Sequence, residues 1–222
     1  MVSSVPAHAL ARRRRLQKPR AAATAGSMCN LYSMTSNVEA LRRLFGRFEG
    51  DTSNLPPFEE IYPGKPAPVL RRTEEGALRL ETMRWGFPPP PAAGKRPITN
   101  VRNLDSPFWR TALSRPDRRC IVPATSFCEW TGEVGAKQKV WFSLRDEDRL
   151  PFAFAGLWRP TEQGPAMAFL TCDANPLVAR VHPKAMPVML DPDGAMRWLA
   201  DERESACALA IPYPAEAMRV LA

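Results

Sequence analysis

The sequence contains few of the residues from which metal and disulfide sites are built. Only two histidines are present, His8 and His182, and His8 lies within the first 27 residues. The five cysteines are odd in number, and no two of them have C-x-x-C spacing. Neither a disulfide framework nor a zinc site is therefore indicated, and we expect a reduced, cytoplasmic protein with no metal ion.

Other common signals are missing as well. No apolar run approaches the ~20 residues of a membrane-spanning helix, so no membrane partner is expected. The sequence has no GxGxxG, Walker, HExxH or GxSxG motif, which removes the commonest nucleotide, metal and hydrolase interpretations. We accordingly expect no cofactor.

Acidic residues are absent from residues 1–27, which hold six of the 31 Lys and Arg residues. The rest of the chain carries the other 25 bases against 23 acids, so most of the net charge of +8 belongs to this leader. The leader lacks the apolar core of a secretory signal. We expect residues 1–27 to be a disordered basic leader, from a misassigned start or a processed segment, and residues 28–222 to be a single catalytic domain.

Positive charge within this domain is concentrated in one segment. Residues 95–119 contain seven bases against Asp105 and Asp117. A cluster of this density can bind phosphates, although a charge run is usually a solvated face.

The 24 prolines disfavour long helices and favour short strands with fixed turns. Helices are predicted over Asn37–Phe48 and Asp193–Ala200, with strands at 69–72, 77–85, 119–123, 126–130, 139–144, 151–157, 166–172 and 187–190. Because βαβ alternation is lacking, this order predicts an α+β fold with a mostly antiparallel, barrel-like sheet and a few short helices.

Cys29 follows Met28 at the point where the leader ends. If Met28 is removed, Cys29 carries a thiol and an α-amine on one residue, both partly nucleophilic at neutral pH. Such an aminothiol captures aldehydes, because the amine condenses to an imine and the sulfur then closes a thiazolidine. The alternative is that Cys29 is a small buried hydrophobic residue.

Two further residues have environments that suit catalysis. Glu129 lies in a predicted strand rich in apolar residues, where burial would raise its pKa and suit it to general acid–base work; alternatively, strand alternation turns it to solvent. His182 precedes Pro183 in a rigid loop that can present it to a cleft, although a lone histidine is more often structural.

Binding candidates carry weaker signals. Asn100 can bond a substrate hydroxyl or phosphate with Arg102 beside it as an anion clamp, or can satisfy its own backbone. Trp85, next to a proline-rich loop, is the tryptophan for which we expect an exposed stacking role.

Together these residues resemble the SOS-response-associated peptidase family of abasic-site processing proteins. Four segments match in the order typical of the family: Met28-Cys29, Thr99-Asn100-Val101-Arg102, Phe127-Cys128-Glu129-Trp130, and His182 with Met186-Pro187-Val188. Tyr62-Pro63-Gly64 and Arg84-Trp85-Gly86-Phe87-Pro88 are further landmarks, and the resemblance spans roughly residues 28–212.

The resemblance implies a DNA damage response enzyme of peptidase or lyase type. Its N-terminal cysteine would capture the aldehyde of an abasic site in single-stranded DNA as a thiazolidine crosslink, after autoproteolytic exposure of that cysteine. The implied catalytic residues are Cys29 as nucleophile, Asn100 positioning the deoxyribose or the cysteine amine, Glu129 shuttling protons, and His182 assisting imine chemistry and crosslink reversal. Arg102, Trp85, Thr171 and Lys184 are implied on the DNA-binding face of a monomer associated with the nucleoid.

Three departures from the family pattern bear on this expectation. The leader blocks the Cys29 amine in the chain as written. The common Cys-Gly-Arg opening is Cys29-Asn30-Leu31, which removes one phosphate contact, and the arginine-methionine-proline run becomes Lys184-Ala185-Met186-Pro187. Lysine pairs with phosphate as a point charge rather than as a planar fork.

Two other functions fit the sequence. One is a cysteine-dependent peptidase that processes only its own leader. The other is a non-catalytic single-stranded-DNA-binding module that uses residues 95–119 and exposed tryptophans, with an affinity that falls steeply with salt and does not depend on Cys29.

Overall fold

The computed structural model describes Met1 and residues 29–50, 55–90, 94–133, 135–145 and 150–221. The expected leader lies outside the described residues, apart from Met1. The strands are β1 Tyr32–Met34, β2 Phe58–Ile61, β3 Pro66–Arg72, β4 Leu78–Trp85, β5 Asn100–Val101, β6 Arg119–Ala124, β7 Ser126–Thr131, β8 Gln138–Leu144, β9 Phe152–Arg159, β10 Ala166–Cys172, β11 Met186–Pro187, β12 Met189–Leu190 and β13 Met218–Val220. The α-helices are α1 Val38–Phe45, α2 Pro107–Leu113, α3 Pro192–Ala200 and α4 Arg203–Cys207, and the 3₁₀ turns are η2 Pro116–Arg118, η3 Val178–Arg180 and η4 Ala215–Ala217.

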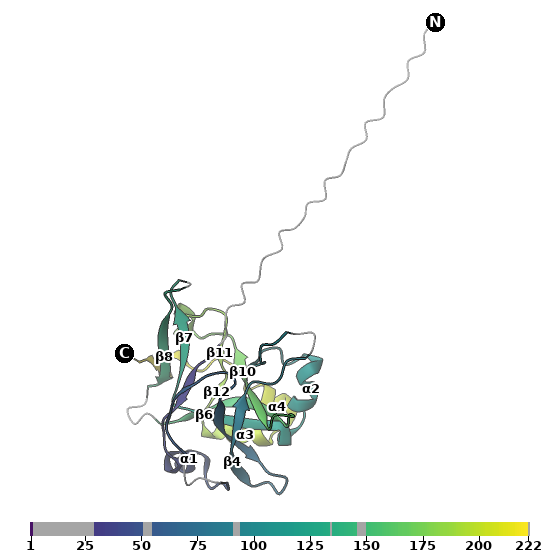
Figure 1. Ribbon diagram of the computed structural model, residues 1–222, viewed down its shortest axis with the longest axis vertical. Helices are drawn as coiled ribbons and strands as arrows, with labels where there is room; N and C mark the ends of the chain where they lie inside the picture. The colour runs from purple at the N-terminus through teal and green to yellow at the C-terminus, as the bar shows by residue number, and fades with distance from the viewer. Residues whose placement is uncertain (2–28, 51–54, 91–93, 134, 146–149, 222) are drawn as a thin grey trace.

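Five strands close into a ring in the order β10–β4–β3–β6–β9, because β9 pairs back with β10. Every pairing within the ring is antiparallel except that of β4 with β10, which is parallel. The α+β fold with a mostly antiparallel sheet is therefore confirmed, and the barrel-like sheet takes the form of this ring. Figure 1 shows β4, β6 and β10 in the middle of the molecule, with α2 and α4 on the right.

A second sheet holds the strand that follows Cys29. Its order is β13–β8–β7–β1–β2, and β1 pairs with β7 in the register Tyr32↔Phe127. The Tyr32 ring packs edge-on against Trp85, Phe154 and Phe169, whose strands belong to the ring. The two sheets thus share one apolar core.

Local sequence signals account for the helix ends. The Asn37 side chain accepts a hydrogen bond from the Ala40 amide at 2.9 Å and caps α1, and Gly46 ends the helix with φ of 81°. At α3 the Asp191 carboxylate accepts from the Gly194 amide at 2.7 Å. Both predicted helices are confirmed, and α1 ends three residues earlier than expected because Gly46 adopts a left-handed conformation that favours glycine. Among the described residues, no helix is long and apolar enough to cross a membrane.

Arg119, counted above with the basic segment, is fully buried. Its guanidinium donates to the carbonyl of Leu113 at 2.7 and 3.1 Å, to that of Trp198 at 3.1 Å and to that of Asp201 at 2.5 Å. Within the same segment, Arg115 is paired with Asp117 at 2.6 and 2.9 Å. Residues 95–119 therefore do not form one continuous basic face, contrary to the simplest interpretation of the charge run.

Candidate active site

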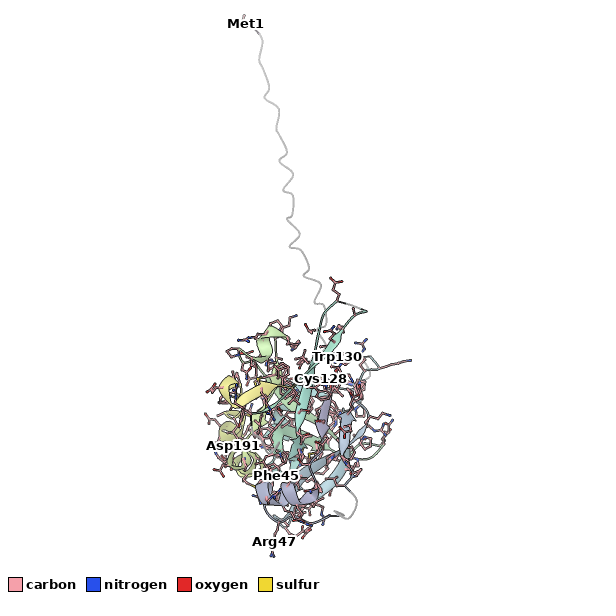
Figure 2. All side chains as sticks on the ribbon, turned by 90° about the vertical axis from the view of Figure 1, so that its left-hand side faces the viewer. Met1, Phe45, Arg47, Cys128, Trp130 and Asp191 are labelled. Carbon is pink, nitrogen blue, oxygen red and sulfur yellow. The ribbon has the colours of Figure 1, made fainter. Side chains whose placement is uncertain are left out.

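Cys29 lies immediately before β1, inside the protein. Its side chain is 2% exposed, and its sulfur lies 3.7 Å from the Leu31 carbonyl oxygen and 3.8 Å from that of Cys128. The Cys128 amide donates to the Leu31 carbonyl at 2.9 Å, so pairing with β7 fixes the chain next to Cys29. In Figure 2 the labelled Cys128 and Trp130 of β7 lie well away from Phe45 at the end of α1.

Glu129 comes from β7 and is 1% exposed. Its Oε1 atom accepts no hydrogen bond from any residue that the structure describes. Burial raises the pKa of this carboxyl to about 8. The solvent-facing alternative for Glu129 is wrong: the residue lies in a strand whose apolar neighbours pack inward, and the carboxyl is desolvated with them.

Asn100 comes from β5, which pairs with β10 opposite Phe169. Its amide nitrogen donates to the Cys29 carbonyl at 3.2 Å and to the Thr99 hydroxyl at 3.0 Å. Its Oδ1 atom is buried and has no donor among the described residues. Asn100 thus holds the backbone of Cys29 and retains an acceptor that a bound group can satisfy.

His182 follows η3 in the loop that leads to β11. Its Nδ1 atom lies 2.9 Å from the Ala185 carbonyl oxygen and 3.9 Å from Oε2 of Glu129. Because a carbonyl only accepts, this bond requires a proton on Nδ1 and leaves Nε2 as the acceptor of the neutral ring. The structure therefore brings together Cys29, Asn100, Glu129 and His182, from four separate parts of the chain.

The surroundings of this cluster raise the pKa values of Cys29 and Glu129. Burial, and secondly the nearby charge of Glu129, raises the pKa of the Cys29 thiol well above its ordinary value. The thiol is therefore protonated at neutral pH, and attack by its sulfur requires a partner that removes the proton. Glu129, with its pKa of about 8, can accept or donate a proton in this range.

A stability measurement tests the environment of Glu129. Between about pH 4.5 and 8 the folded protein keeps a carboxyl proton that the unfolded chain has released, so the Glu129 contribution to stability falls as pH rises. We expect the stability of Glu129→Gln relative to the wild type to rise over this range, by on the order of 5 kcal/mol in urea denaturation. The exposed Glu59→Gln is the matched control, and a difference that does not vary with pH would contradict the buried, protonated carboxyl.

The four DNA-binding candidates lie in different environments. Arg102 and Lys184 are exposed, and Arg102 pairs with Asp173. Thr171 is 3% exposed, in β10 opposite Pro187. The expectation of an exposed Trp85 is wrong: its ring is fully buried and stacked on Phe169, and its Nε1 donates to the Thr99 carbonyl at 3.0 Å. Trp85 therefore supports the strand beside Asn100 and offers no surface to a base.

Sequence reasoning missed one contact beside the cluster. The Trp130 indole, next to Glu129, donates to the Asn30 side chain at 2.9 Å. This bond ties the residue after Cys29 to the residue after Glu129. Only the strand register brings the two together, since they are 100 positions apart.

Metal ligands do not gather here. Among the described residues, no group of three or more His, Cys, Asp and Glu side chains is arranged to hold a metal ion.

A strand ring with a buried cysteine, amide and carboxyl and a half-buried imidazole at one place defines a protein with a cysteine-centred polar site. The chain belongs to the SOS response associated peptidase (SRAP) family, which it matches over residues 28–222. The solved structures of two proteins, from Bordetella bronchiseptica and Bacteroides thetaiotaomicron, share the fold. The structure from Bordetella bronchiseptica has a TM-score of 0.69 and 24% sequence identity, and the match covers 86% of this chain and 98% of that one. The structure from Bacteroides thetaiotaomicron has a TM-score of 0.71 and 22% sequence identity, and the match covers 86% of this chain and 90% of that one.

Curated relatives carry more specific names. The abasic site processing protein YoaM of Bacillus subtilis (strain 168) is 32% identical over 153 residues, or 63% of this chain and 66% of that protein. YoqW of the same strain, also named an abasic site processing protein, is 33% identical over 132 residues, or 54% and 57%. The abasic site processing protein HMCES of Xenopus tropicalis is 24% identical over 189 residues, or 68% and 56%. The chain thus spans 56 to 66% of the length of these relatives.

Proposed function

We propose that this protein processes abasic sites in single-stranded DNA by covalent capture through Cys29, once Cys29 is the first residue of the chain. The observation that carries the proposal is the cluster around Cys29, in which Asn100 holds its backbone and the buried Glu129 lies close enough to shift its pKa. The names of the relatives, which describe abasic-site processing, supply the substrate class.

The reaction joins one aldehyde to one aminothiol. The α-amine of Cys29 adds to the ring-opened aldehyde of the lesion and water leaves, giving an imine. The sulfur then bonds to the imine carbon, the thiol proton is removed, and the imine nitrogen takes up a proton. The product is a thiazolidine, and the net loss is one water.

A side chain of the cluster is available for each proton transfer of this reaction. Glu129 protonates the ring oxygen of the deoxyribose as it opens and removes protons during imine formation, which suits a pKa of about 8. The unpartnered Oδ1 of Asn100 accepts from the Cys29 amine or from a deoxyribose hydroxyl. Nε2 of His182 accepts a proton during imine chemistry and crosslink reversal.

Phosphate contacts in this proposal come from the exposed side of the cluster. Arg102 exchanges Asp173 for a phosphate, Lys184 supplies a second charge, and Thr171 lies on the strand between them. Trp85 has no part in this binding because it is buried.

We further propose that residues 28–222 act as one monomeric catalytic domain near the nucleoid. Residues 1–28 are either not made or removed by the same cluster. Self-processing is chemically reasonable because Glu129 and the Cys29 thiol lie beside the bond to be broken.

Intact mass of two proteins tests the proposal: one begins at Cys29, the other retains residues 1–28. Each is incubated with a single-stranded oligonucleotide containing one abasic site. We expect the first to gain the mass of the oligonucleotide less one water, and the second to gain it only after losing its leader. No mass shift for the protein beginning at Cys29 would overturn covalent capture, and an equal shift with an intact leader would overturn the role of the amine.

A further inference from the structure

A second polar pocket lies away from Cys29, at the start of β4. It has a volume of about 310 Å³ and is formed by the β3–β4 hairpin, η2 and the end of β9. Four arginines line it: Arg71, Arg72, Arg79 and Arg118. Arg79 is the second residue of β4 and Trp85, which contacts Thr99 beside Asn100, is the last, so the pocket is roughly 20 Å along the strand from the cysteine cluster.

Two N–H donors in this pocket lack an acceptor, and the Thr73 hydroxyl beside them has no hydrogen-bond partner among the described residues either. The Nε atom of Arg72 and the Nε1 atom of Trp158 are buried, and neither has a hydrogen-bond partner among the residues that the structure describes. A buried donor without an acceptor destabilises the protein, and more so when it is charged. Two such donors in one cavity point to a ligand that accepts hydrogen bonds.

The other charges of the pocket are already paired. Arg71 binds Glu81 through two nitrogens at 2.7 and 3.1 Å, and Arg79 binds Glu49 at 3.2 Å. Asp117 is held by Arg115, and its Oδ2 atom also lies 3.6 Å from the Nε atom of Arg118. The Arg72 guanidinium bonds only a backbone carbonyl, that of Gly76 at 2.8 Å, in the described part of the chain. The remaining carboxylates, Glu74 and Glu75, belong to the exposed turn of the hairpin.

The shape of the site restricts the ligand further. The Trp158 ring has the Arg71 guanidinium 4.6 Å from its centroid and the Arg118 guanidinium 5.1 Å away. With two guanidinium groups over the ring, a nucleobase has no free stacking platform there. The ligand is therefore an oxyanion and not an aromatic group.

We propose that this pocket binds a phosphate group, with Arg72 and Trp158 as its donors and Arg118 as an additional charge. A phosphate presents several acceptor oxygens and matches a guanidinium better than a single-point acceptor does. The group comes from a free phosphate compound or from a DNA backbone that passes the end of the protein opposite Cys29. The site does not depend on the capture chemistry proposed above.

The test uses inorganic phosphate as the probe and its ³¹P line width as the readout, at constant ionic strength. We expect wild-type protein to broaden the signal and Arg72→Gln to weaken binding about tenfold, as expected for loss of a charged donor. Trp158→Phe removes the N–H, keeps an aromatic ring, and is expected to weaken binding without loss of folding. Arg43→Gln, the same charge change on the exposed face of α1, is the matched control.

A second arm identifies the source of the phosphate. An unmodified single-stranded oligonucleotide is titrated into the same four proteins. If Arg72→Gln lowers the affinity for the oligonucleotide tenfold and inorganic phosphate does not bind, the site is assigned to a DNA backbone. If Arg72→Gln lowers the affinity for inorganic phosphate and leaves that for the oligonucleotide unchanged, the site is assigned to a free phosphate compound. The proposal is overturned if Arg72→Gln and Arg43→Gln bind both probes alike, or if neither probe binds the wild type, whatever the outcome of the abasic-site experiment.

Discussion

With alanine in place of Cys29, protein whose chain begins at residue 29 is expected to form no stable adduct with an abasic site. The variant keeps its α-amine, so the imine still forms, but no sulfur is present to close the thiazolidine. An imine at this carbon acidifies the neighbouring hydrogen of the deoxyribose, and the 3′ phosphate then leaves by β-elimination. The substitution is therefore expected to convert capture into strand cleavage.

A denaturing gel measures both outcomes for Cys29→Ala. We expect the heat-stable crosslink to fall below detection, the amount of nicked strand to rise, and a covalent complex to reappear when borohydride reduces the imine. Cys207→Ala, the same change in α4, is the control and is expected to crosslink as the wild type does. A heat-stable adduct in Cys29→Ala without reductant would show that another nucleophile captures the lesion.

The second large effect concerns stability. Replacing Arg119 by methionine is expected to destabilise the protein by about 3–5 kcal/mol, as for other buried charged groups whose partners are left unsatisfied. Leu113 is the last residue of α2, and Trp198 and Asp201 lie at the end of α3. The Arg119 guanidinium thus satisfies carbonyls at two helix ends, where backbone acceptors lack partners and positive charge is favoured.

Urea denaturation at neutral pH measures the loss in Arg119→Met. Arg110→Met, an exposed position of α2, is the matched control and is expected to change stability by no more than about 0.5 kcal/mol. Arg119→Lys keeps the charge but loses the planar guanidinium with its several donors, and we expect an intermediate loss of stability. A loss below 1 kcal/mol in Arg119→Met would mean that water replaces the guanidinium at these carbonyls.

Much of the fold is predictable because its signals are local. Asn37 marks the start of α1 through side-chain capping, whereas Gly46, which ends the helix, lay inside the range predicted for it. The Glu74-Glu75-Gly76 turn separates two strands that pair along their length. The pair that closes the ring, β9 with β10, joins two strands that follow each other directly in the sequence. The parallel pairing of β4 with β10 carries no such signal, because it joins segments about 80 residues apart.

For the site residues, too, local sequence signals predicted some features and only the packing decided others. Cys29, Asn100, Glu129 and His182 were predicted from sequence as candidates, and the structure brings them together. Whether Glu129 faced solvent or the interior depended on which strands flank β7. Trp85 was misjudged because its proline-rich neighbours suggested a surface loop, whereas its ring packs across to β10. Arg119 was counted with surface charge because arginine is rarely buried, and only the meeting of two helix ends explains it.

The pairing of β1 with β7 fixes the position of Cys29 relative to Glu129. Tyr32 lies opposite Phe127, and Cys29 stands three positions before it. Since neighbouring residues of a strand face opposite sides, one inserted or deleted residue between them would turn the thiol away from Glu129. If the chain is cut before Cys29, as proposed above, the position of the cut is therefore fixed by its distance from a paired strand.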